Sequence, residues 1–331
     1  MRPLVMLFGA SGRLGQAIAA NPSFAAYSLK CFPHAECDAA DRQAVEAVFG
    51  ECCPAQAPMA VVNAAGFTDV ALAQKLRRTR AGREQVLRAN ALVPEVLAAA
   101  AASRGAAFLQ ISTDYVFSGG GLKAHRPQSR PRPEGFYGYS KYLGERAVER
   151  TYARTRLPWA VLRIGWVHGA PGDFVEKVLD AALAGRLKTM RSDQWGAPTS
   201  YDAAAAACGE VLSRLLEQEA APLGVCHYAE SGPFTNRFRL AQRILARAAE
   251  ETERRAEAAS DEKTRAELKK VSACFSFCAL KLKGFRVHDP SRPANCRLLC
   301  GQVGFEKLSN CYSWKSSVDN SVDNFLSRRG L

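Results

Sequence analysis

Short aliphatic runs alternate with longer amphipathic stretches through the first half of the chain. The runs predict strands at Leu4–Phe8, Ser28–Phe32, Ala60–Asn63, Ala107–Ile111 and Trp159–Ile164. Apolar residues at helical spacing predict helices over Leu14–Ala20, Arg42–Phe49, Glu84–Ser103 and Tyr139–Ala153. Strands and helices that alternate in this way form βαβ units. The pattern therefore predicts an α/β fold, a Rossmann-type doubly wound parallel sheet with helices on both faces.

The rhythm changes after Val167, where a smaller second lobe is expected. Its predicted elements are helices over Phe174–Ala184, Asp202–Glu217 and Phe238–Ala249 and a strand at Val225–Ala229. We expect an NAD(P)-binding domain over residues 1–167, to which segments of the second lobe return, and a substrate-binding lobe over 168–331. Almost every second residue of Glu250–Lys270 is charged, which predicts a solvated helix or a mobile insert outside the core.

Composition narrows the class of protein. The chain of 331 residues is 47% hydrophobic and 23% charged, the balance of a soluble globular protein. Its net charge of +13 would attract anionic ligands. No aromatic–basic repeat indicates nucleic-acid binding, and no apolar run is long enough to cross a bilayer. With the first strand starting near Leu4, no signal peptide is expected. We expect a cytoplasmic protein without nucleic-acid or membrane partners.

The eleven cysteines have no spacing typical of secreted modules and are expected to be free thiols. Two C-x-x-x-C pairs occur, Cys274/Cys278 and Cys296/Cys300. Structural zinc sites prefer the closer C-x-x-C spacing, so no metal site is predicted.

A glycine-rich segment with the spacing G-x-x-G-x-x-G, Gly9–Gly15, separates the first strand from the first helix. Glycines there permit a tight turn, a close approach of the backbone to a pyrophosphate, and close packing of helix on strand. Unpaired amides at the helix N-terminus would face the phosphates. The candidate cofactor-binding residues in this segment are Gly9, Ser11, Gly12, Arg13, Leu14 and Gly15.

The end of the second strand bears on the choice of cofactor. An acidic residue often binds the ribose 2′-hydroxyl of NAD at this place, but here the residues include Lys30 and His34. Cationic side chains favour the 2′-phosphate of NADP slightly over NAD; the alternative is that Lys30 and His34 simply face solvent. Asp38 follows and is a candidate for contact with the adenine.

Tyr137 and Lys141 form a Y-x-x-x-K pair on one face of a predicted helix. A neighbouring ammonium group is expected to lower the pKa of the phenol, which could then act as a general acid toward a carbonyl. Lys141 could also hold the nicotinamide ribose. Upstream, hydroxyls in Ser112–Phe117 follow the fourth strand, where parallel sheets bind ligands. Each signal alone also arises by chance or as a cap, but together and in this order they predict a catalytic site.

These segments resemble the dTDP-4-dehydrorhamnose reductases. The matching motifs are Gly9–Gly15, Val62–Ala65, Ser112–Phe117, Tyr137–Lys141, Arg163–Gly169, Asp193–Thr199 and Arg292–Asn295. The resemblance covers most of residues 3–245 and resumes around 288–300. It implies reduction of a 4-keto group on a nucleotide-diphosphate sugar by NAD(P)H. It also implies a catalytic trio of Thr113, Tyr137 and Lys141, cofactor contacts at Asn63, Ala64 and Ala65, and substrate contacts at Ser112, Trp166, Phe174 and Gln194.

The sequence also departs from that family. The run Val70–Gln74 lacks the usual acidic pair, and Asp173 replaces an asparagine, where a carboxylate would repel a diphosphate unless it faced a sugar hydroxyl. A close relative with much the same motifs is the regulatory beta subunit of methionine adenosyltransferase, whose partner is the catalytic subunit. Such a regulator would need an exposed apolar surface, for which Val271–Leu282 is the candidate. An epimerase or dehydratase with tightly held NAD is a weaker alternative, and a homodimer is left open.

Overall fold

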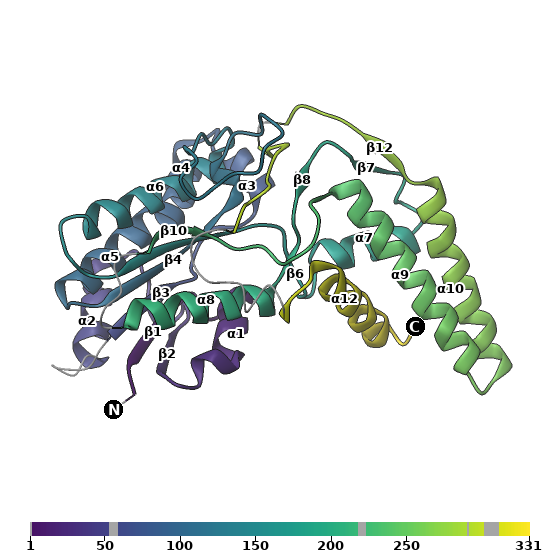
Figure 1. Cartoon of the computed structure of the whole chain (residues 1–331), viewed down its shortest axis with the longest axis horizontal. Helices are drawn as coiled ribbons and strands as arrows, with labels where there is room; N and C mark the ends of the chain where they lie inside the picture. Colours follow the sequence, from purple (N-terminus) through teal and green to yellow (C-terminus); the bar gives the residue numbers. More distant parts are fainter. Residues whose placement is uncertain (1, 53–58, 218–222, 290, 301–310) are drawn as a thin grey trace. The chain divides into compact units, whose positions relative to one another are not determined.

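The computed structural model describes residues 2–52, 59–217, 223–289, 291–300 and 311–331 (Figure 1). It divides into two compact units. The first unit consists of Met1–Gly165, Tyr201–Ala229 and Asp289–Leu308, and the second of Trp166–Ser200, Glu230–His288 and Ser309–Leu331. The chain therefore passes from one unit to the other several times.

A six-stranded sheet organises the first unit. Its strands are β1 (Leu4–Phe8), β2 (Ser28–Phe32), β3 (Met59–Asn63), β4 (Ala107–Thr113), β5 (Trp159–Ile164) and β10 (Gly224–His227). They lie in the order β10-β5-β4-β3-β1-β2, with every neighbouring pair parallel. This confirms the predicted doubly wound sheet. Because β2 and β3 lie on opposite sides of β1, the carboxyl ends of β1 and β3 form the switch point where such folds bind ligands.

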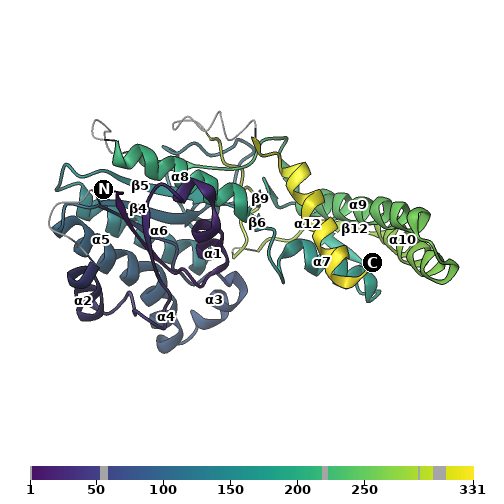
Figure 2. The same cartoon turned by 90° about the horizontal axis from the view of Figure 1, so that it is seen from below.

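Helices cover both faces of this sheet. α1 (Arg13–Ala20) and α8 (Tyr201–Leu216) lie on one face, and α2 (Arg42–Cys52), α5 (Val93–Ser103) and α6 (Phe136–Tyr152) on the other (Figures 1 and 2). The large buried side chains of Phe8, Phe49, Leu97, Phe108 and Tyr152 pack together beneath the second set. β1, β3 and β4 are buried along their whole length, which explains why apolar residues predominate in them.

The helix expected over Glu84–Ser103 begins earlier and is not regular. α3 (Val70–Leu76), which the sequence pattern did not indicate, and α4 (Arg80–Leu87) precede a π-helical turn, η2 (Arg88–Leu92), which leads into α5. Pro94 has no N–H to donate to the carbonyl of Asn90, and its ring would crowd that carbonyl, so the helix widens there. By length and composition Arg80–Ser103 could span a membrane, but half of its apolar window is buried within the fold.

Within the described residues, the second unit contains α-helices and short strand pairs. The helices are α7 (Phe174–Leu183), α9 (Arg237–Ala258), α10 (Glu262–Lys281) and α12 (Trp314–Arg329). The strand pairs are β6 (Val167–His168) with β9 (Thr199–Ser200), β8 (Trp195–Gly196) with β11 (Thr235–Asn236), and β7 (Thr189–Arg191) with β12 (Lys283–Phe285).

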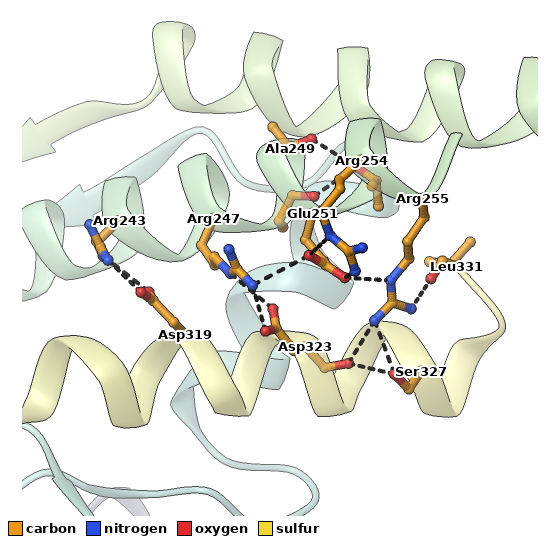
Figure 3. Close-up of polar contacts among 12 residues, drawn as sticks. Arg243, Arg247, Ala249, Glu251, Arg254, Arg255, Asp319, Asp323, Ser327 and Leu331 are labelled. Atoms are coloured by element: carbon orange, nitrogen blue, oxygen red, sulfur yellow. Dashed lines mark hydrogen bonds and ion pairs between the residues drawn. The ribbon is translucent and has the colours of Figure 1, made fainter. Parts of the chain in front are cut away.

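The charged segment expected outside the core continues α9 and begins α10. Glu251 is 3% exposed and accepts hydrogen bonds from Arg247, Arg254 and Arg255 (Figure 3). Arg247 also pairs with Asp323 of α12, 2.6 Å away. The segment is helical, as one alternative had it. The expectation that the segment lies outside the core is wrong for the face of α9 that carries Glu251, because that carboxylate is buried. The surrounding arginines compensate its charge.

Candidate active site

The glycine-rich loop after β1 is shaped by close backbone contacts. Gly9 has a φ of 80°, and a Cβ there would lie 2.4 Å from the amide nitrogen of Ala65. A Cβ on Gly15 would lie 2.2 Å from the carbonyl oxygen of Gly9. Only glycine fits either position, so the first turn of α1 packs directly against the strand end, as a dinucleotide cradle requires.

The beginning of α1 faces solvent. Ser11, Gly12 and Arg13 are exposed and Leu14 is half-buried. Gly12, the N-cap residue, has no side chain to cap the helix, and the first turn carries no acidic residue. The positive end of the helix can therefore meet a phosphate, so the residues present fit the diphosphate of a dinucleotide.

The end of β3 lies against this loop. The buried Asn63 donates from Nδ2 to Gln110 Oε1 at 2.8 Å and accepts from the amide of Ala65 at 3.0 Å. The amide of Ala64 donates to the carbonyl of Phe8 at 3.0 Å. Asn63 thus fixes the turn that approaches Gly9, and the structure brings these predicted cofactor residues together at the switch point.

The acidic and basic candidates after β2 have different environments. Asp38 accepts from Arg88 of η2 at 2.6 Å and from the amide of Ala40 at 3.0 Å. The Arg88 bond holds the pKa of Asp38 below its ordinary value. Lys30 and His34 are exposed, and their proposed contact with a 2′-phosphate stays a prediction.

Tyr137 and Lys141 lie together on α6, which begins at Phe136, three residues before the predicted start. Lys141 is buried, and its Nζ donates to the carbonyl of Ile111 on β4 at 2.8 Å. Thr113, the last residue of β4, forms a side-chain hydrogen bond with Tyr137. Tyr139, which lies two residues after Tyr137 on the same helix, is 45% exposed. The expected trio is thus adjacent within the first unit.

The electrostatics of this trio differ from the sequence expectation. Burial raises the pKa of Tyr137 above its ordinary value of 10.0, the bond with Thr113 lowers it, and the Asp114 carboxylate raises it further. The expected lowering by Lys141 is wrong for this structure. Instead, burial lowers the pKa of Lys141 to about 8 against the opposing effect of Glu145. Tyr137 is therefore a protonated phenol at neutral pH, and Lys141 is close to its own titration.

Ser112, a predicted substrate contact, belongs to a buried ion pair. Its hydroxyl donates to Glu145 Oε1 at 2.5 Å. Arg163 donates to the same carboxylate through Nε at 2.9 Å and through a terminal nitrogen at 2.6 Å. This bidentate pair joins α6 to β5, and the bond from Ser112 adds β4 to it. The predicted contact of Ser112 with a substrate stays a prediction.

In the second unit, Trp166, Phe174 and Gln194 surround Arg237. The guanidinium carbon lies 3.7 Å from the centre of the Trp166 ring and 4.5 Å from that of Phe174. The amide of Arg237 donates to the carbonyl of Gln194 at 3.2 Å. Trp166 has a φ of 52°, uncommon for a residue with a side chain. The three predicted substrate residues of this unit therefore converge.

The repulsion expected between the Asp173 carboxylate and a diphosphate is reduced by backbone hydrogen bonds. It is the N-cap of α7, and its carboxylate accepts from the amides of Gly169 at 2.6 Å and Glu176 at 3.0 Å. Backbone donors thus compensate the charge of this residue, which precedes Phe174.

Residues 1–327 match the family described as the RmlD substrate binding domain. The chain belongs to this family. A dTDP-4-dehydrorhamnose reductase of Streptomyces griseus is 31% identical over 235 residues, covering 71% of this chain and 73% of its own. The spore coat polysaccharide biosynthesis protein SpsK of Bacillus subtilis is 30% identical over 229 residues, covering 69% and 74%.

Solved structures of RmlD-family reductases share the fold. That of a dTDP-4-dehydrorhamnose reductase from Clostridium acetobutylicum has a TM-score of 0.73 at 22% identity and covers 97% of this chain and 99% of its own. That from Bacillus anthracis, solved in complex with NADP, has a TM-score of 0.71 at 21% identity and covers 98% and 100%. The predicted family resemblance is confirmed.

Two residues of this RmlD-family site were missed from the sequence. Asn90, buried in η2, bonds the amide and carbonyl of Phe67 at 2.8 and 3.0 Å and Ser140 Oγ at 2.9 Å. Ser140 Oγ in turn donates to the carbonyl of Tyr137 at 2.8 Å. A lone asparagine within an apolar helix was the available signal. Arg237 is the second, and it lies outside every motif of the resemblance.

Proposed function

We propose that this chain is an NADPH-dependent reductase that acts on the 4-keto group of a deoxythymidine-diphosphate sugar, as its relatives named dTDP-4-dehydrorhamnose reductase do. The observation that carries the proposal is the adjacency of Thr113, Tyr137 and Lys141 at the carboxyl end of β4, in the unit that holds the glycine cradle. Membership of the RmlD family supplies the class of substrate.

The nicotinamide cofactor supplies the hydride when it is bound. Tyr137 donates the proton to the carbonyl oxygen of the substrate, since its raised pKa keeps the phenol protonated at neutral pH. Thr113 orients that phenol through their side-chain hydrogen bond. Lys141, which is mostly charged at neutral pH, stabilises the phenolate after the transfer and holds the cofactor ribose.

NADP is favoured over NAD. Lys30 within β2 and His34 just after it are exposed, and the strand carries no acidic residue, which suits a 2′-phosphate. The reductase of Bacillus anthracis, which has the same fold, was solved in complex with NADP. A comparison of turnover with NADPH and NADH tests this choice directly.

The sugar nucleotide is proposed to contact Trp166, Phe174 and Gln194 in the second unit and Ser112 in the first. The enzyme is proposed to act in the cytoplasm. A homodimer remains a further expectation, to be tested by the molar mass in solution.

The test is reduction of dTDP-4-dehydrorhamnose, followed as NADPH oxidation. Tyr137→Phe should lower kcat by about 10²–10⁴-fold, the usual contribution of a positioned general acid. Its affinity for NADPH should stay near that of the wild type, because the phenol oxygen is not part of the glycine cradle. Tyr139→Phe is the matched control, since this exposed phenol lies two residues away. Full activity in Tyr137→Phe would contradict the assignment of Tyr137 as the general acid.

The alternative of a regulatory subunit has one observation in its favour. Phe277 and Leu280, within the segment predicted to contact a partner, are 60% and 84% exposed. The named relatives and structures are reductases or polysaccharide biosynthesis proteins, which favours the enzyme. Co-purification with a methionine adenosyltransferase catalytic subunit, lost in Phe277→Ser, together with no NADPH oxidation, would favour the regulator.

A further inference from the structure

One of the two C-x-x-x-C pairs, Cys274 and Cys278, lies one helical turn apart on α10. Both thiols donate to the same atom, the carbonyl oxygen of Ala182 on α7: Cys274 Sγ lies 3.7 Å from it and Cys278 Sγ 3.8 Å. Burial and then the neighbouring Cys274 raise the pKa of the Cys278 thiol. The two thiols therefore form a pair between α7 and α10, within the second unit.

The other pair with this spacing, Cys296 and Cys300, is arranged differently. Neither residue is helical, and their sulfurs contact different carbonyl groups. Cys296 Sγ donates to the carbonyl of Pro293 at 3.4 Å, and Cys300 Sγ to that of Ala229 at 3.6 Å. Spacing in the sequence alone thus does not bring two thiols together, and the helix is what pairs Cys274 with Cys278.

Helical geometry makes a disulfide unsuitable for Cys274 and Cys278. Side chains four residues apart on a helix have Cβ atoms about 5–6 Å apart, whereas a disulfide needs about 3.5–4.5 Å. An ion between the sulfurs removes this limit, because two metal–thiolate bonds of about 2.3 Å each separate the sulfurs by up to about 4.6 Å. The pair is therefore spaced for bridging by one ion rather than for a direct bond between the sulfurs.

The surroundings of the pair select the kind of ion. Structural zinc takes four ligands, and no group of three or more histidine, cysteine or acidic side chains gathers among the residues that the structure describes. Hard cations need oxygen ligands, but residues 268–288 contain no aspartate or glutamate. Soft ions such as Cu⁺ prefer thiolates. Two thiolates and one Cu⁺ carry a net negative charge, which the five lysines and arginines of the same stretch offset.

We propose that Cys274 and Cys278 form a two-coordinate site for a soft monovalent cation of the Cu⁺ class. Binding breaks two S–H bonds, forms two S–Cu bonds and releases two protons to the solvent, and no atom is oxidised or reduced. The partly buried Cys274 gives the ion access from solvent, since Cys278 is only 8% exposed. The bound ion links two turns of α10 beside α7 and so stabilises the folded chain. This site is independent of the proposed reductase activity.

Anaerobic titration of the reduced full chain with Cu⁺, in competition with the chromophoric chelator bicinchoninate, tests the proposal. The wild type should bind one Cu⁺ whose affinity falls by at least about 100-fold in Cys274→Ser and in Cys278→Ser, because a single thiolate remains. The affinity of the wild type should rise with pH, since binding displaces protons. Cys31→Ser is the matched control: it removes an exposed thiol of the first unit and should leave this binding unchanged.

Thermal melting gives a second readout. One equivalent of Cu⁺ should raise the Tm of the wild type and of Cys31→Ser, but not that of Cys274→Ser or Cys278→Ser. Melting of the metal-free variants identifies a loss that comes from unfolding, and Cys274→Ser decides the matter if the buried Cys278→Ser does not fold. Three results would overturn the proposal: wild-type Cu⁺ affinity in Cys274→Ser, an equal fall in Cys31→Ser, or tighter binding of Zn²⁺ than of Cu⁺ at this pair.

Discussion

The ammonium group of Lys141 donates a 2.8 Å hydrogen bond to the carbonyl oxygen of Ile111, two residues before Thr113 on β4. This bond ties α6 to the end of β4, which carries the hydroxyl of Thr113. It also keeps a cation in a buried position, which lowers its pKa from 10.5 to about 8. Burial therefore disfavours the charged form of Lys141.

That lowered pKa makes stability depend on pH. Between pH 8 and 10.5 the unfolded chain retains a proton that folded Lys141 has released, so the free energy of unfolding should rise with pH across this window. We expect the wild type to gain about 2 kcal/mol over Lys141→Met between pH 7.5 and 10 in urea unfolding. Comparison with the variant cancels the other titrating groups. A difference that stays constant would contradict the burial of a charged lysine.

Alanine substitutions at Gly15 in the glycine cradle and at Gly50 in α2 should have opposite effects on stability. Gly15→Ala places a Cβ 2.2 Å from the carbonyl oxygen of Gly9, so we expect a loss of about 1–3 kcal/mol in unfolding free energy. NADPH affinity should fall at least roughly tenfold, because the loop must move from the phosphates. Gly50→Ala in α2 is the control: its Cβ meets nothing within 4 Å, and it should stabilise by about 0.5–1 kcal/mol. Equal effects of the two substitutions on NADPH binding would argue against the cradle.

Local patterns account for what the sequence predicted well. The strand–glycine–helix unit around Gly9 and the Tyr137–Lys141 pair depend on neighbours within a few residues, and periodicity reports such neighbours. The parallel direction of the strands follows from their alternation with helices. Two-residue strands such as β6 have no periodicity to read, and the π-turn at Arg88–Leu92 depends on how Pro94 packs.

Contacts between distant segments could not be predicted. Asn90 and Ser140 are 50 residues apart, and nothing in either segment announces their bond. Arg237 is one of many arginines in a basic chain, and only its position against Trp166 distinguishes it. The direction of the pKa shift at Tyr137 was wrong because the expectation counted the ammonium and not burial or the Asp114 carboxylate. Burial is a property of the whole fold.

Asn90 should act as a positioning residue for the acid. Its side chain joins Phe67 to Ser140, and Ser140 holds the carbonyl of Tyr137 at the start of α6. In Asn90→Leu, the amide and carbonyl of Phe67 and the buried hydroxyl of Ser140 lose their bonds, and we expect a loss of about 1–3 kcal/mol in unfolding free energy. We also expect kcat to fall while KM for NADPH changes little. Asn90→Asp should restore the acceptor toward Phe67 but not the donor to Ser140. A loss of stability with unchanged kcat would leave Asn90 a structural role only.

The cluster around Glu251 should stabilise the second unit in a pH-dependent way (Figure 3). Hydrogen bonds from Arg254 and Arg255 lower the pKa of the buried Glu251 from 4.5 to about 2. A carboxyl with a lowered pKa stabilises the folded state above pH 4.5, and this contribution is lost as the pH falls toward 2. Glu251→Gln should therefore cost about 2–3 kcal/mol at pH 7, since it removes the buried carboxylate that the partly buried Arg247 and Arg255 contact. The difference from the wild type should be roughly half as large at pH 3.

Glu262→Gln in the same unit removes a pair whose glutamate is 84% exposed, and it should cost less than about 1 kcal/mol. Urea unfolding of the wild type, Glu251→Gln and Glu262→Gln at pH 7 and pH 3 measures these differences in the free energy of unfolding. If Glu251→Gln matched Glu262→Gln at pH 7, the arginines would be solvated charges and not the partners that hold α9 to α12.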